Sequence, residues 1–164
     1  MENVNVHLLL GTNLGDRAEN LAKCRQGIGE LARIVATSKI YLTEAWGMKD
    51  QPDFYNQAIE VASDLSAIDL LQKLQDLEFE IGRVRNVRWE SRIIDIDILY
   101  YGDHVCNSDD LKLPHPLLAK RNFALVPLLE IAPLKVDPVS GKTIEELYLG
   151  CEDTLDVLLV EHGV

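Results

Sequence analysis

Two aspartates two residues apart, Asp95 and Asp97, are the residues of this chain best suited to hold a metal ion. They lie in the run IDIDI (94–98), whose strict alternation of apolar and acidic residues predicts a β-strand. Residues two apart in a strand share a face, so the carboxylates should project side by side while the isoleucines enter the core. Paired carboxylates suit Mg²⁺, which completes its shell with water and substrate phosphates. The alternative is an ordinary half-buried strand with an acidic solvent face, although aspartate is disfavoured in strands and like charges repel.

Positive charge is concentrated immediately before this strand. Four arginines opposed only by Glu90 give a local charge of +3 in a chain of net charge −11; they are Arg83, Arg85, Arg88 and Arg92. The planar guanidinium group matches phosphate oxygens. A solvated run of counter-ions is the alternative. Next to a carboxylate pair, however, the arginines complete what a polyphosphate–Mg²⁺ site needs: donors for phosphate oxygens and anchors for the metal.

Three further polar residues are candidates for the same site. His115 lies in the stiff run Leu-Pro-His-Pro (113–116), and Arg121 follows six residues later. Glu78 is a charged residue near the apolar stripe at the end of a predicted helix. For His115 the alternative is a surface histidine, and for Glu78 it is a boundary residue that faces water.

The elements that must position these residues follow the order β-α-β-β-α-β. Strands are predicted at 4–10, 35–42, 54–62 and 93–101. One helix starts at Asp16, with an apolar stripe that continues to Val35, and a second starts at Ser66 and ends at Gly82. This order predicts an α+β fold, the split βαβ (ferredoxin-like) arrangement with an antiparallel sheet and both helices on one face. Residues 43–52 read as a loop. The less regular C-terminal third should hold short turns or helices near 117–131 and 143–149, then an apolar segment.

Composition narrows the class of protein. The 164 residues suit a single domain, 1–164, and a pI near 4.7 argues against nucleic-acid binding, which needs a broad basic face. The three cysteines form no CxxC pair, which favours reduced thiols and a cytoplasmic location. No apolar run is long enough to span a membrane. We expect small-molecule substrates, and nothing in the sequence indicates an obligate protein partner.

Four segments in order resemble the 6-hydroxymethyl-7,8-dihydropterin pyrophosphokinase family of folate biosynthesis. The segments are LLLGTNLGDR (8–17), TEAWGMKDQPDFYNQAIE (43–60), GRVRNVRWESRIIDIDILYYG (82–102) and LPHPLLAKRNFALVPLLEIAP (113–133). The resemblance implies Mg²⁺-dependent transfer of diphosphate from ATP to the hydroxymethyl group of the pterin, with release of AMP. The family usually has Trp-Gly-Pro-Arg where this chain has Trp-Glu-Ser-Arg (89–92).

The resemblance also implies roles for individual residues. Asp95 and Asp97 match the ligands of two magnesium ions, and with Arg83 and Arg92 they form the expected catalytic group. Residues expected to contact ATP are Glu78, Arg85, Arg88, Arg92, Ile98, His115 and Arg121. Residues expected to contact the pterin are Thr43, Trp46, Phe54, Asn56, Trp89, Asp95 and Phe123, with Phe54 and Phe123 enclosing its ring.

Three other interpretations remain open on sequence alone. A nucleotidyltransferase can also use a D-x-D strand, but the Gly-Ser turn expected some ten residues earlier is missing. An RNA-binding module can be built on a split βαβ sheet, but it needs a basic, aromatic strand motif. A folded but inactive relative is the third. The run Ser-Gly-Lys-Thr (140–143) is not a P-loop, because the required first glycine would fall at Val136.

Overall fold

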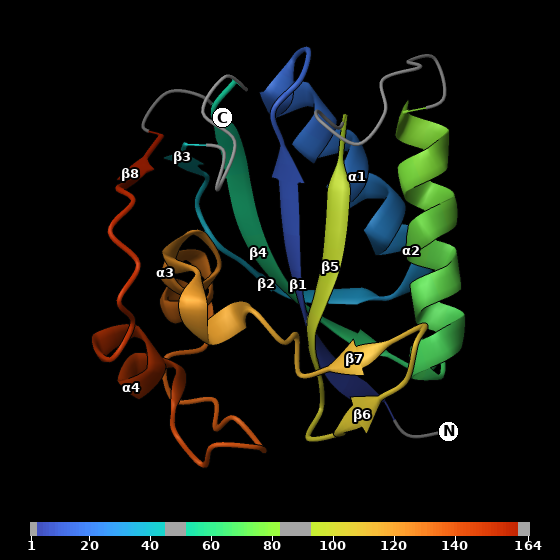
Figure 1. The fold of residues 1–164 in the computed structure, drawn as a ribbon. Coiled ribbons are helices and arrows are strands. Elements are labelled where there is room, and N and C mark those ends of the chain that lie inside the picture. Colours follow the sequence, from blue (N-terminus) through green and yellow to red (C-terminus); the bar gives the residue numbers. More distant parts are fainter. Residues whose placement is uncertain (1–2, 45–51, 83–92, 161–164) are drawn as a thin grey trace.

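The centre of the protein is an antiparallel β-sheet. The computed structural model describes residues 3–44, 52–82 and 93–160. Within these residues the sheet contains β1 (Val4–Thr12), β2 (Arg33–Thr37), β3 (Tyr41–Thr43), β4 (Phe54–Ser63), β5 (Asp95–Tyr101) and β8 (Val157–Leu159). The strand order is β5-β1-β4-β3-β8, and β2 also pairs with β4. The predicted combination of helices with an antiparallel sheet is therefore confirmed (Figure 1).

Helices cover both faces of this sheet. The first face carries α1 (Arg17–Leu31) and α2 (Ala67–Gly82), and the second carries α3 (Asn122–Ile131) and α4 (Ile144–Leu149) (Figure 1). A hairpin of β6 (Cys106–Asn107) and β7 (Lys112–Leu113) and a 3₁₀ turn (Leu118–Lys120) lie between β5 and α3. Among the helices of the described ranges, none is long and apolar enough to cross a membrane.

The alternation of side chains along the strands divides the apolar residues into two cores. In β1, Val6, Leu8 and Leu10 belong to the core beneath α1 and α2. Leu9 points the other way and packs in the core beneath α3 and α4. The same alternation in β5 sends Ile96 and Ile98 into the first core. Asp95 and Asp97 therefore face the side of α3, as the IDIDI pattern predicts.

Both predicted helix starts are confirmed by their caps. The Asp16 carboxylate accepts a hydrogen bond from the Glu19 N–H at 3.1 Å, and the Ser66 hydroxyl accepts one from the Asp69 N–H at 3.1 Å. Thr143, the last residue of the run that resembles a P-loop, caps α4 through a capping box with Glu146.

Several predicted boundaries are wrong. The first helix ends at Leu31, since Ala32 is extended (φ −157°, ψ 163°), and Val35 belongs to β2. The strand predicted at 35–42 is divided into β2 and β3. Thr37 pairs with Ile59 of β4, and Tyr41 pairs with Asn56 of β4. The chain therefore advances four residues from β2 to β3 while β4 advances only three, and the extra residue interrupts the strand.

Two further differences concern the ends of elements. Thr43, predicted to begin a loop, is the last residue of β3, and β5 begins at Asp95 instead of residue 93. The apolar C-terminal segment contains β8, which extends the sheet by pairing with β3. The short helices predicted near 117–131 and 143–149 are confirmed.

Candidate active site

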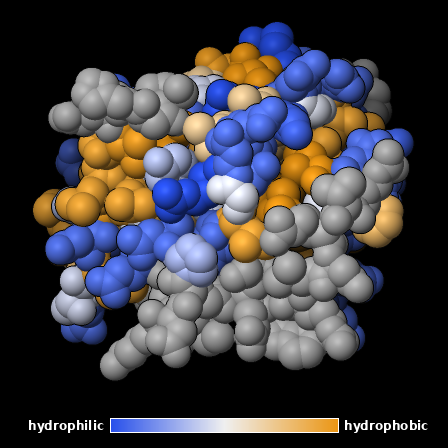
Figure 2. Space-filling model, turned by 90° about the horizontal axis from the view of Figure 1, so that it is seen from above, coloured by the Kyte–Doolittle hydropathy of each residue, from blue (hydrophilic) through white to orange (hydrophobic). Residues whose placement is uncertain are grey.

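A pocket of about 170 Å³ lies at the end of the sheet toward which β1 runs. It is lined by Leu9, Gly11, Thr43, Glu44, Phe54, Asn56, Asp95, Asp97, Arg121 and Phe123. Four neighbouring strands, β5, β1, β4 and β3, contribute lining residues, and the start of α3 supplies one wall. Figure 2 looks at the molecule from this end, where hydrophilic residues gather in the middle between hydrophobic areas. A small concave site with a few polar groups is typical of a ligand-binding pocket.

The floor of the pocket depends on a glycine. Gly11 of β1 pairs with Asn56 of β4 on one side and with Asp95 of β5 on the other. A Cβ atom on Gly11 would lie 3.0 Å from the Asn56 Oδ1 and 3.7 Å from the Phe54 ring. The first distance is too short for Asn56 to keep its present position, whereas the second is an ordinary contact. Glycine therefore leaves a gap in the floor of the pocket, with the Asn56 amide on one side and the Asp95 carboxylate on the other.

Asn56 is held in a fixed orientation. Its Nδ2 donates a hydrogen bond of 3.0 Å to the Thr43 hydroxyl, and both side chains are buried. Because Nδ2 is engaged, Oδ1 is the atom of this amide that faces Gly11 and the pocket. A buried polar pair of this kind fixes a directional hydrogen-bond acceptor in the pocket wall.

Glu78 of α2 adds a third carboxylate near the aspartates. Its Oε2 accepts a hydrogen bond of 2.6 Å from the Ile96 N–H, on the edge of β5 that faces away from β1. Burial, together with the negative charges of Asp95 and Asp97, raises the pKa of Glu78 to about 7, although the Ile96 bond opposes this. Glu78 is thus a constrained group beside the site and does not simply face water.

His115 and Arg121 approach the aspartates from the other side. The His115 Nε2 lies 4.0 Å from the Asp97 Oδ2, while its Nδ1 accepts a hydrogen bond of 3.2 Å from the Leu117 N–H. In the neutral ring the proton is therefore on Nε2, facing Asp97. Burial and the nearby Arg121 charge lower the pKa of His115. Burial also lowers the pKa of Arg121, whose guanidinium lies 5.4 Å from the centre of the Phe123 ring.

The donor set fits magnesium. Within residues 3–44, 52–82 and 93–160, no group of three or more histidine, cysteine or acidic side chains forms a closed metal site. Asp95 and Asp97 instead offer two hard oxygen ligands next to open space, the arrangement in which Mg²⁺ keeps water and phosphate in its other positions. A cation there would also offset the repulsion that raises the pKa of Glu78.

The structure brings together most of the described residues that the sequence predicted. Seven line the pocket, namely Thr43, Phe54, Asn56, Asp95, Asp97, Arg121 and Phe123. Glu78 and His115 lie beside it. The Ile98 side chain is buried in the opposite core, so any contact it makes with ATP must use its backbone. Trp46, Arg83, Arg85, Arg88, Trp89 and Arg92 lie outside the described residues.

Three residues of the pocket were not predicted from the sequence: Leu9, Gly11 and Glu44. For Gly11 a signal was present, since it interrupts the apolar run of β1 just before the strand ends, which often marks close approach by a side chain or ligand. Leu9 and Glu44 carried no comparable signal, because their place in the pocket depends on strand register and on the end of β3.

Comparisons with known proteins agree with this geometry. The model of the family described as 7,8-dihydro-6-hydroxymethylpterin-pyrophosphokinase (HPPK) matches residues 7–133, a range that includes every site residue predicted above. The 2-amino-4-hydroxy-6-hydroxymethyldihydropteridine pyrophosphokinase of Aquifex aeolicus is 40% identical over 141 residues, 86% of this chain and 88% of that protein. The protein of the same name from Haemophilus influenzae is 38% identical over 146 residues, 88% of this chain and 91% of that protein.

A solved structure shows the same fold. Plasmodium falciparum HPPK-DHPS A437G matches with a TM-score of 0.74 at 17% identity, over 90% of this chain and 45% of that one. At this identity the likeness concerns the fold alone, whereas the family is shown by the sequence matches. The chain belongs to the 7,8-dihydro-6-hydroxymethylpterin-pyrophosphokinase family.

Proposed function

We propose that the pocket binds the pterin ring and that the adjacent aspartates hold the magnesium ions that accompany ATP. As a family member, the protein transfers a diphosphoryl group from ATP to the hydroxymethyl group of 6-hydroxymethyl-7,8-dihydropterin in folate biosynthesis. The hydroxymethyl oxygen forms a bond to the β-phosphorus and releases its proton to solvent, as the bond between that phosphorus and the oxygen that stays with AMP breaks.

The pterin side of the proposal rests on shape and on one directional group. Phe54 and Phe123 come from different elements and both line the pocket, so a flat heterocycle between them would be in contact with two aromatic faces. The Asn56 Oδ1 then accepts a hydrogen bond from the edge of the ring, since its Nδ2 is engaged by Thr43. Trp46 and Trp89 are proposed as further pterin contacts.

The nucleotide side rests on charge. Asp95 and Asp97 would hold Mg²⁺, with two ions expected, on the pocket face of β5. The ions would neutralise phosphate oxygens and make the β-phosphorus more electrophilic. Arg121 and the Nε2–H of His115 donate to phosphate oxygens from the opposite wall, and Glu78 and the backbone of Ile98 contact the nucleoside. Arg83, Arg85, Arg88 and Arg92 are proposed to neutralise the triphosphate.

One observation supports this arrangement most directly. Asn56, Gly11 and Asp95 lie in register across three neighbouring strands. The Asn56 amide, which would recognise the pterin, and the Asp95 carboxylate, which would hold magnesium, therefore lie on either side of Gly11 in the pocket. A hydroxymethyl group on a ring at Asn56 is thereby directed toward phosphates at Asp95. Positioning of this kind is the main contribution a protein makes to phosphoryl transfer.

Incubation of the purified protein with MgATP and 6-hydroxymethyl-7,8-dihydropterin tests the proposal. We expect AMP and the pterin diphosphate to form in equal amounts, as measured by chromatography and ³¹P NMR. Neither should form without the pterin or with excess EDTA. Formation of ADP, or attachment of AMP to the pterin, would contradict the proposed reaction.

We also propose the finer features expected from the sequence. The order of β5, β1, β4 and the β2/β3 segment, with α1 and α2 on one face, supports the split βαβ class. Residues 1–164 are proposed to form a single pyrophosphokinase domain. Three free cysteines support a cytoplasmic location.

A further inference from the structure

The turn between β1 and α1, with the first residues of the helix (12–20), makes hydrogen bonds to two distant parts of the chain. Two bonds, from the Thr12 hydroxyl and from the Asn20 Nδ2 at 3.4 Å, reach the carbonyl of Ile93, which precedes Asp95 by two residues. The others reach Pro52 and Asp53, which immediately precede Phe54. None of these turn residues lines the pocket. They nevertheless hold the start of β5, which carries the proposed metal ligands, and the start of β4, which carries the proposed pterin contacts.

The contact with Ile93 is a short chain of buried hydrogen bonds. The Asn20 Nδ2 donates to the Thr12 Oγ1 at 3.1 Å and to the Leu14 carbonyl at 2.8 Å. The Thr12 hydroxyl in turn donates to the Ile93 carbonyl. Thr12 is fully buried and Asn20 nearly so. In such a place a lost partner leaves a desolvated polar group, so the Ile93 carbonyl is held firmly in one position.

The contact with residues 52–53 uses two other side chains. The Asn13 Nδ2 donates to the Pro52 carbonyl at 3.2 Å, and the Arg17 guanidinium donates to the Asp53 carbonyl at 2.8 Å. The same guanidinium lies 4.2 Å from the centre of the Tyr55 ring. The start of β4 is thus held on both sides of Phe54, which fixes the direction in which the Phe54 ring enters the pocket.

We propose that this turn positions the two halves of the active site independently. Thr12 and Asn20 are positioning residues for Asp95 and hence for magnesium. Arg17, with Asn13, is a positioning residue for Phe54 and hence for the pterin. The proposal rests on the proposed function and assigns a role to residues that contact neither substrate.

The first test is Thr12→Val, which keeps the size of the side chain and removes its hydroxyl. We expect kcat to fall about tenfold and the Mg²⁺ concentration for half-maximal activity to rise about fivefold, with the KM for pterin within twofold of wild type. Thr12→Ser, which keeps the hydroxyl, should restore both parameters. If Thr12→Val does not fold, Asn20→Ala provides the same test, because it removes the donor to Thr12.

Tyr101→Phe is the matched control for this half. The Tyr101 hydroxyl donates to the Leu65 carbonyl at 2.5 Å, so the variant also removes a hydroxyl–carbonyl bond made by β5, but from its other end. It should lower the melting temperature and leave the kinetics unchanged. A Thr12→Val protein with wild-type kcat and Mg²⁺ dependence overturns the first half of the proposal.

The second test is Arg17→Met, which keeps a long apolar stem over Tyr55 and removes the donor to Asp53. We expect the KM for pterin to rise about fivefold while the Mg²⁺ dependence stays within twofold. Arg25→Met is the control, because Arg25 of the same helix bonds the Gln57 side chain of β4 at 2.8 Å. Equal changes in both parameters, or none, overturn the second half. All variants are compared with the wild-type protein. If the wild-type protein itself is inactive, the proposed function is refuted, whereas an active wild type with unaffected variants refutes only the positioning roles.

Discussion

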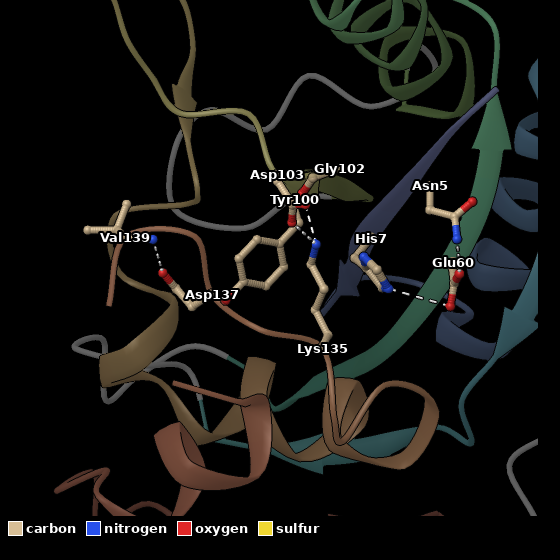
Figure 3. A network of polar contacts seen from close by, with 9 residues as sticks. All are labelled: Asn5, His7, Glu60, Tyr100, Gly102, Asp103, Lys135, Asp137 and Val139. Atoms are coloured by element: carbon tan, nitrogen blue, oxygen red, sulfur yellow. Dashed lines mark hydrogen bonds and ion pairs between the residues drawn. The ribbon is translucent and has the colours of Figure 1, made fainter. Parts of the chain in front are cut away.

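The second face of the sheet carries two polar clusters that differ in how their charges are balanced. The pocket cluster contains Asn56, Asp95, Asp97 and Arg121. At the opposite end of the same face is the basal network, which contains Asn5, His7, Glu60, Tyr100, Asp103, Lys135 and Asp137 (Figure 3). Between them, Leu9, Ala58 and Leu99 pack beneath α3.

In the basal network most charged and hydrogen-bonding groups have a partner within the protein, although the buried His7 Nδ1 has none among the described residues. The His7 Nε2 lies 3.4 Å from Glu60, which also accepts a hydrogen bond from Asn5 at 3.0 Å. Lys135 donates to Asp103 and to the Gly102 carbonyl, both at 2.9 Å. The Tyr100 hydroxyl donates to Asp137 at 2.8 Å. This cluster stabilises the fold.

In the pocket cluster like charges lie close together. Asp95, Asp97 and Glu78 are near enough to one another to raise the pKa of Glu78 to about 7, with burial as the main cause. Repulsion of this kind costs folding free energy, and the nearby Arg121 guanidinium, together with a bound Mg²⁺ ion, would offset it. The comparison indicates that the basal network serves stability and the pocket cluster serves binding, which predicts opposite responses to substitution.

Asp97→Asn should have the largest effect. The amide keeps the shape of the side chain and removes a charge that would hold Mg²⁺, so kcat should fall at least about a hundredfold, or about 2.7 kcal/mol. Stability should change little, because the removal of a like charge near Glu78 is opposed by the loss of attraction to Arg121. Initial rates and thermal unfolding measure the two effects. The matched change in the basal network, Asp103→Asn, should leave the rate unaltered. If Asp103→Asn loses as much rate as Asp97→Asn, the two clusters do not differ in function as proposed.

The pH dependence of stability should report on His7. Burial and the nearby Lys135 charge lower the pKa of His7 from 6.5 to about 4. A lowered histidine pKa favours folding above the unfolded value of 6.5, and this contribution is lost as the pH falls from there toward 4. Between about pH 7 and about pH 5, roughly 2 kcal/mol of the stability difference between wild type and His7→Gln should disappear. Urea unfolding of both proteins at both pH values measures this stability difference. If the difference does not depend on pH, the lowered pKa of His7 is not its cause.

Gly11→Ala should affect the pocket cluster more mildly. The new Cβ would lie 3.0 Å from the Asn56 Oδ1, so this acceptor must shift. We expect the KM for pterin to rise about tenfold, about 1.4 kcal/mol, with little change in Mg²⁺ dependence. Gly29→Ala in α1 is the control, since its nearest neighbour would be at an ordinary 3.7 Å. Unaltered pterin affinity in Gly11→Ala would show that Asn56 does not contact this substrate.

Tyr100→Phe should have the smallest effect. It removes the hydroxyl that donates to Asp137, and one buried hydrogen bond contributes about 1 kcal/mol. We expect a loss of about that size in urea unfolding and wild-type kinetics. A change in kcat without a change in stability would show that the basal network is coupled to the pocket.

Patterns local in sequence predicted the parts of the site that depend on one strand or one helix end. The shared face of Asp95 and Asp97 followed from alternation, and the start of α1 followed from the cap at Asp16. Glu78 was harder to interpret, because its bond to the Ile96 N–H joins residues eighteen apart through the packing of α2 on β5. Spacing alone cannot supply such a contact.

Features that depend on strand pairing were missed. The division of residues 33–43 into β2 and β3 results from the register against β4, and β8 exists as a strand because β3 offers it a partner. The pocket role of Gly11 likewise depends on Asn56 and Asp95 arriving on either side of it. The basal network, too, depends on pairing between distant segments, since Asn5 and His7 of β1 contact Glu60 of β4 and Tyr100 bonds Asp137.

The outer edge of β5 has a consequence for association between chains. Among the strands of residues 3–44, 52–82 and 93–160, β5 is the last on its side of the sheet, and an edge strand can pair with a strand of another molecule. Here the Glu78 carboxylate occupies the Ile96 N–H, and the His115 N–H donates to the Leu99 carbonyl at 3.0 Å. The residues that bring Glu78 and His115 to the aspartates therefore also block this edge against intermolecular β-sheet growth.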